Sequence, residues 1–186
     1  MKNNMKLIQK FLMIVMVMLA WSSITISAKG DKVDDNHLSC DGPYVIYLPD
    51  GGVRVVSVTV AGEVKDTTYA SLPDNFTLHV TDHEGNYPFD VRLHPVVRQE
   101  WKQSQAKKTF VMSDPHGRLN LVISLLQANG VIDSQLRWSY GDNQLVVIGD
   151  IFDRGYDVPQ IFWLFYKLEA EAAECGGRVS VMLGNH

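Results

Sequence analysis

Two features are scarce in this sequence: cysteine, and apolar runs long enough to form a membrane-spanning helix. The two cysteines, Cys40 and Cys175, allow at most one disulfide, and the sequence fits one bridge and two free thiols equally well. The N-terminal apolar run, Phe11–Trp21, covers 11 residues, whereas a spanning helix needs about 20. No internal repeat is present, which excludes a solenoid, and a composition of 46% apolar and 20% charged residues is typical of a globular protein.

The first 28 residues have the three parts of a secretory signal peptide. Lys2, Lys6 and Lys10 form a positive segment without acidic residues, the apolar run follows, and small or polar residues lead to Ala28. We therefore expect export to the periplasm or the extracellular space, with no stable membrane anchor. Removal of residues 1–28 takes the net charge from −4 to −7, which disfavours binding to nucleic acid or to anionic membranes.

The sequence between the signal peptide and residue 107 predicts a tail, a β-rich segment and a connector. Residues 29–40 are charged and polar, which is typical of a flexible tail. Residues 41–95 contain alternating apolar and polar positions, and predict about four to six short antiparallel strands. Pro-Asp-Gly-Gly at 49–52 predicts a hairpin turn. Residues 96–107 are polar and form the connector.

From residue 108 the pattern changes to strands that alternate with helices. Apolar runs predict three strands, at 109–113, 144–148 and 178–183. Apolar residues at helical spacing predict two helices between them, one ending at Gly130 and one capped by Asp157. This order predicts an α/β fold with parallel strands, whose carboxyl ends carry the chemistry.

Polar residues of the metal-ligating kind follow each of these three strands. They are Asp-Pro-His-Gly at 114–117, Gly-Asp-Ile-Phe-Asp-Arg-Gly at 149–155, and Gly-Asn-His at 184–186. We expect the strand ends to bring four side chains together: Asp114, His116, Asp150 and Asn185. Carboxylate, imidazole and amide donors suit Mn, Fe or Zn. Taken singly, Asp114 also fits a helix cap and Asp153–Arg154 a surface ion pair, but the three motifs in order favour a metal site.

This order of motifs resembles the signature of the calcineurin-like metallophosphoesterases. The Asp-Arg-Gly form resembles the phosphoprotein phosphatase branch, and Ala-Glu-Cys-Gly-Gly-Arg-Val at 173–179 together with the export signal is similar to the bacterial Shewanella-like phosphatases. The resemblance covers residues 108–186. It implies the N-terminal half of a metallophosphoesterase β-sandwich flanked by helices, with the βαβαβ part present and preceded by a small β-rich segment at 41–95.

The resemblance also implies a role for each site residue. Asp114 and His116 would bind one divalent ion, Asp150 would bridge two ions (Mn, Fe or Zn), and Asn185 would bind the second. Arg154 would hold the phosphate, and His186 would be the catalytic acid or would orient the substrate. Asp153 would position Arg154 or another group beside the ligands. The implied activity is two-metal hydrolysis of phosphate monoesters on a phosphorylated protein or small molecule.

Other functions remain open at this stage. The same metal core serves phosphodiesterases and nucleotide pyrophosphatases. The chain ends at His186, before the further histidines that such sites use, so we expect little activity from these 186 residues alone. A non-catalytic exported fragment is the alternative: a reading frame that supplies more histidines favours the enzyme, and a stop codon favours the fragment.

A second cluster of metal-ligating residue types lies in the β-rich segment. His79, Asp82 and His83 fit a small separate metal site, and they also fit a polar hairpin turn at 82–86. The turn is the simpler interpretation, because these residues match no metal motif of the resembling family.

We predict that the signal peptide is removed and that the mature chain begins near Lys29. N-terminal sequencing of exported protein checks this expectation. A cytosolic protein that retains Met1 would contradict it.

Overall fold

A computed structural model describes residues 40–100 and 102–186, so the predicted signal peptide and almost all of the tail lie outside the described residues. The described residues form three sheets: β1-β2-β3, β4-β5 and β6-β7-β8. Two helices, α2 and α3, connect the strands of the β6-β7-β8 sheet. No helix in the described part of the chain is both long and apolar enough to cross a membrane.

The β-rich segment consists of an antiparallel sheet followed by a hairpin, as its alternating pattern predicted. The strands are β1 (Asp41–Tyr47), β2 (Val53–Val58), β3 (Val64–Tyr69), β4 (Thr77–Val80) and β5 (Phe89–Arg92). The predicted turn at 49–52 closes β1 on β2, where the Leu48 N–H donates to Gly52 O at 2.8 Å.

The strand β3 was not predicted, because its mostly polar residues show no alternation of apolar and polar positions. Backbone pairing with β2 holds this strand in place. The side chains add an ion pair in which Arg54 Nε donates to Asp66 Oδ1 at 2.8 Å. Cross-strand pairing thus stabilises a strand that has little apolar surface to bury.

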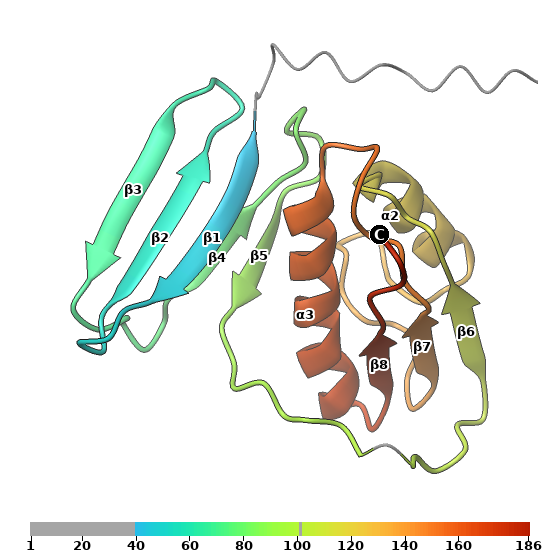
Figure 1. Cartoon of the computed structure of the whole chain (residues 1–186). Helices are drawn as coiled ribbons and strands as arrows, with labels where there is room; N and C mark the ends of the chain where they lie inside the picture. The colour runs from blue at the N-terminus through green and yellow to red at the C-terminus, as the bar shows by residue number, and fades with distance from the viewer. Residues whose placement is uncertain (1–39, 101) are drawn as a thin grey trace, which may run out of the picture. The chain divides into compact units, whose positions relative to one another are not determined.

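The second half alternates strands and helices, as predicted. Its elements are β6 (Thr109–Met112), α2 (Leu119–Ala128), β7 (Gln144–Val147), α3 (Val158–Glu174) and β8 (Arg178–Val181). The three strands are parallel and lie in sequence order, so their carboxyl ends point the same way (Figure 1). The connector runs from β5 back to β6 and contacts β8, where Gln99 Nε2 donates to Val179 O at 2.6 Å.

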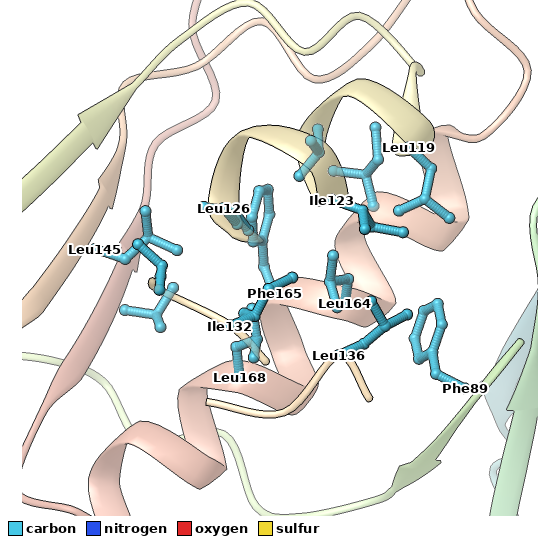
Figure 2. Packing of buried hydrophobic residues seen from close by; sticks show 14 of the residues in the cluster. Phe89, Leu119, Ile123, Leu126, Ile132, Leu136, Leu145, Leu164, Phe165 and Leu168 are labelled. Atoms are coloured by element: carbon cyan, nitrogen blue, oxygen red, sulfur yellow. The ribbon is translucent and has the colours of Figure 1, made fainter. Parts of the chain in front are cut away.

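One apolar core joins the helices, the parallel sheet and the β4–β5 hairpin. Figure 2 shows side chains of α2 and α3 meeting between the two helices, among them Leu126, Leu164 and Phe165. Phe89 of β5 and Leu145 of β7 belong to the same buried cluster. Full burial of such a side chain stabilises the fold by about 1.5–3 kcal/mol.

The residue before α3 does not act as predicted. Asp157 occupies the N-cap position, but its side chain makes no capping hydrogen bond. Its carboxylate instead accepts hydrogen bonds from His83, 74 residues earlier in the chain. The carboxylate therefore makes a long-range contact with the hairpin turn in place of the expected local cap.

Candidate metal centre

The predicted ligands converge at the carboxyl ends of β6 and β7. Asp114, His116 and Asp150 each offer one ligand atom, and these atoms lie within 4.8 Å of one another. Within residues 40–100 and 102–186, this is the only group of three or more His, Cys, Asp or Glu donors so arranged. A carboxylate–imidazole–carboxylate set is suited to a divalent ion such as Mn, Fe or Zn.

Backbone hydrogen bonds hold the loops after β6 and β7 against each other. The Asp114 N–H donates to Gly149 O at 3.1 Å, and the His116 N–H donates to Asp150 O at 3.0 Å. One residue further on, the Gly117 N–H donates to Ile151 O at 2.9 Å. The ladder of the parallel sheet therefore continues into the loops and fixes the ligand positions.

The chain end after β8 joins this arrangement through Asp150. Asp150 Oδ1 accepts the Asn185 N–H at 2.9 Å and the His186 N–H at 3.1 Å. The His186 N–H contributes most to holding the pKa of Asp150 below its ordinary value, and the Asn185 N–H adds to it. The structure thus places the Asn185 backbone next to the other predicted ligands.

His116 is oriented by a carbonyl oxygen that sequence analysis did not single out. Its ring is buried, and Nδ1 lies 2.8 Å from Phe152 O. Because a carbonyl oxygen only accepts, Nδ1 carries the hydrogen, which leaves Nε2 of the neutral ring as the donor for a metal ion. Ser113 Oγ donates to Asp114 Oδ1 at 2.5 Å and orients that carboxylate in a similar way.

The ligand residues have an unusual backbone conformation. Asp114, His116 and Asp150 have φ values of 55°, 42° and 55°, and Asp153 and Arg154 have 73° and 67°. Residues other than glycine rarely adopt positive φ, and each such position costs about 1–3 kcal/mol. The surrounding contacts must offset this strain, which is a common feature of functional sites.

Two pairs of glycines let the loops approach this closely. A Cβ on Gly117 would lie 2.6 Å from Gly155 O, and a Cβ on Gly149 would lie 2.5 Å from the Gly184 Cα. All four glycines belong to the three sequence motifs. The motifs therefore encode the close packing of the loops as well as the ligands.

The remaining predicted residues lie on the exposed side of the site. His186 Nδ1 is 3.0 Å from Asp153 Oδ2, and the centroids of the His186 and His116 rings are 5.3 Å apart. Asp153 therefore contacts His186 and not Arg154. In the described chain Arg154 is exposed and takes part in no ion pair, so the surface ion-pair interpretation was wrong. The capping interpretation of Asp114 also fails, because α2 has no side-chain cap.

The cluster in the β-rich segment is a hairpin turn. Asp82 is buried, and its Oδ1 accepts the Tyr87 N–H at 2.8 Å, while His79 pairs with Asp90 across the hairpin at 3.0 Å. These contacts assign the acidic and imidazole groups to the turn and its strands. Cys40 and Cys175 are both free thiols.

Several known proteins with similar sequences or structures are phosphatases by name. No protein-family model matches the chain. It is 35% identical over 80 residues to Shewanella-like protein phosphatase 2 of Arabidopsis thaliana, and 36% identical over 80 residues to Shewanella-like protein phosphatase 1 of Plasmodium berghei. The crystal structure of a cold-active protein-tyrosine phosphatase of a psychrophilic Shewanella species superposes with a TM-score of 0.65 at 31% identity.

The chain is a relative of the Shewanella-like protein phosphatases. The match to the Shewanella structure covers 79% of this chain and supports the predicted α/β metallophosphoesterase-like fold. The shared region is only part of each relative. The match to the Arabidopsis protein covers 43% of this chain and 20% of that protein. The match to the Plasmodium protein covers 42% of this chain and 22% of that protein. The match to the Shewanella structure covers 43% of that structure.

We predict that Gly184→Ala weakens metal binding far more than Gly141→Ala does. Both glycines have positive φ, 74° and 61°, so alanine causes similar backbone strain at either position, about 1–2 kcal/mol. A Cβ on Gly184, however, would lie 2.1 Å from Asp150 Oδ1, whereas a Cβ on Gly141 meets nothing within 4 Å. Calorimetric Mn²⁺ titration and urea denaturation of both variants check this, and equal Mn²⁺ affinities would contradict it.

Proposed function

We propose that this protein is a metal-dependent phosphatase that removes phosphate from phosphorylated protein side chains. The observation that carries the proposal is the convergence of Asp114, His116 and Asp150 within 4.8 Å, in a chain related to protein phosphatases. The proposal includes two divalent ions, Mn, Fe or Zn, and action after export from the cytosol.

The donors present fit a divalent ion in charge and in orientation. Asp114 and Asp150 supply negative charge, and the hydrogen bond from His116 Nδ1 to Phe152 O leaves Nε2 as a neutral ligand. Asp150 Oδ1 already accepts two backbone N–H groups, which fixes its carboxylate and favours the ionised form that binds metal. Asn185, whose backbone is held to the same carboxylate, would supply an amide oxygen. Divalent ions held by these residues would supply Lewis acidity toward water and toward the phosphoryl oxygens.

Arg154 and His186 would act on the phosphate ester itself. Arg154 is exposed in the loop that begins at Asp150, so its guanidinium is available to two phosphoryl oxygens. His186 Nδ1 donates to Asp153, which directs the other ring nitrogen away from that carboxylate. A ring held in this way would protonate the leaving oxygen or orient the ester.

The names of the relatives support the proposed substrate class. Two relatives are named as protein phosphatases, and the solved Shewanella enzyme is named a protein-tyrosine phosphatase. An aryl phosphate with Mn²⁺ is therefore the first substrate to test on the natural protein, purified from its own cells. Phosphotyrosine and phosphoserine peptides then define the side chain, and preferential cleavage of a diester would replace the proposal with a phosphodiesterase.

We predict that Asp150→Asn reduces bound metal more than Asp153→Asn does. Asp150 is one of the three converging donors, whereas Asp153 contacts only His186 among these groups. Loss of a group that orients a ligand typically costs about 10–100-fold in affinity or activity, and loss of a ligand costs more. Metal content by mass spectrometry and Mn²⁺ affinity by calorimetry check the order, and equal losses would show that the roles are misassigned.

We predict that Arg154→Ala lowers turnover of an aryl phosphate by about 100–1,000-fold, because a charged donor near the transferring phosphoryl group is lost. Mn²⁺ affinity should stay near the wild-type value, since Arg154 lies outside the converging donors. Arg118→Ala, which removes another exposed arginine next to the site, is the matched control. Full activity of Arg154→Ala would remove this residue from the proposed mechanism.

A further inference from the structure

The β4–β5 hairpin contacts the loop that carries the candidate metal ligands. His83, in the turn of this hairpin, donates its backbone N–H to Asp157 Oδ1 at 2.8 Å. Its ring Nδ1 lies 2.9 Å from the same oxygen. Because a carboxylate only accepts, Nδ1 carries a hydrogen, and the two donors bind one oxygen together.

Burial of Asp157 makes the loss of this contact costly in free energy. The Asp157 side chain is only 4% exposed, whereas the His83 side chain is 29% exposed. A buried carboxylate is costly unless hydrogen-bond donors compensate it, so loss of the imidazole leaves the carboxylate with an unfilled acceptor site. The contact therefore restrains both partners: His83 holds the Asp157 carboxylate in place, and Asp157 holds the hairpin.

A second contact lies one residue earlier in the loop. The rings of His83 and Tyr156 pack with centroids 4.8 Å apart and planes inclined by 31°. Tyr156 and Asp157 directly follow Arg154 and Gly155 in the sequence. The single residue His83 thus contacts two consecutive residues at the end of the ligand-bearing loop.

The contact continues to the ligand His116. The Asp157 N–H donates to Gly117 O at 2.9 Å, and Gly117 directly follows His116. His116 itself is held by Phe152 O, which belongs to the same loop as Asp157. A shift of Asp157 would therefore move both the segment that carries His116 and the carbonyl group that orients its ring.

We propose that His83 is a positioning residue for the candidate metal centre, acting through Asp157. This inference rests on the proposed metal-dependent function. The turn keeps the end of the 149–157 loop in place, so that the strained backbone at Asp150 and at His116 retains the geometry that binds metal. His83 touches neither substrate nor metal in this arrangement, and its effect is indirect.

The test compares three variants of the 186-residue chain. Asn places an amide N–H near the position of imidazole Nδ1, so His83→Asn should keep Mn²⁺ affinity close to wild type. Gln extends its amide toward the position of Nε2, so His83→Gln should weaken Mn²⁺ binding by about 10–100-fold. His79→Gln is the matched control, because His79 lies on the same hairpin and pairs only with exposed Asp90.

Calorimetric Mn²⁺ titrations distinguish the outcomes without any assay of hydrolysis. Equal affinity of His83→Gln and wild type overturns the inference, and so does an equal loss in His83→Asn and His83→Gln. A wild-type chain that binds no Mn²⁺ shows that Asp114, His116 and Asp150 do not form a metal site within these 186 residues, and it overturns the inference; hydrolysis of an aryl phosphate by the natural protein tests the proposed function separately. Thermal unfolding of each variant shows whether a loss of affinity comes from loss of the fold.

A measurement on the wild-type chain keeps the proposal testable if His83→Gln does not fold. Coupling between two equilibria is reciprocal, so a contact that strengthens metal binding must itself be strengthened by metal. Mn²⁺ should therefore slow hydrogen exchange at the His83 amide by the same factor by which the contact raises metal affinity. The β1–β2 turn at 48–52 is the internal control. Unchanged exchange at His83 on Mn²⁺ binding overturns the inference.

Discussion

The carboxylate of Asp150 is the interaction on which the site depends. One of its oxygens accepts two N–H groups from the segment after β8, and its own backbone oxygen accepts the His116 N–H from the segment after β6. A single residue thus joins the ends of three strands. These bonds also stabilise the charged form of the carboxylate, so the same contacts that assemble the loops prepare a ligand for a cation.

Such an assembly needs a rigid support. Positive φ at Asp114, His116 and Asp150 stores strain of about 1–3 kcal/mol per residue, and the isolated loops would relax. The core beneath the loops prevents this, because fully buried side chains such as Leu145 in β7 and Leu164 in α3 hold the strands and helices in one position. The backbone strain at these residues is tolerated because the strands and the hydrogen bonds between the loops hold the loops in one conformation.

The strands and helices of the α/β half were predicted correctly, because each of them has an apolar pattern within its own residues. Apolar periodicity located β6 to β8 and both helices, and a parallel order of strands then implied that Asp114, His116 and Asp150 converge. β3 was not located, since its polar residues carry no apolar pattern and its stability comes from pairing with β2.

The partner of Asp157 could not be predicted for a similar reason. An aspartate directly before a helix is a local signal for a cap, but whether its carboxylate caps depends on which donors the folded chain brings to it. His83 is 74 residues away, and no periodicity connects the two positions.

The hairpin also reaches the site through the core. Leu78, Val80, Phe89 and Val91 of β4 and β5 belong to the same buried cluster as the side chains between α2 and α3. The turn of the hairpin lies at the end of α3 where that helix begins, and this is also the end toward which the parallel strands point (Figure 1). Packing of the hairpin against the core therefore determines where its turn meets the ligand-bearing loop. A change in the β-rich segment need not touch the metal site to alter it, because the apolar contacts below and the His83–Asp157 contact above both set the position of the same loop.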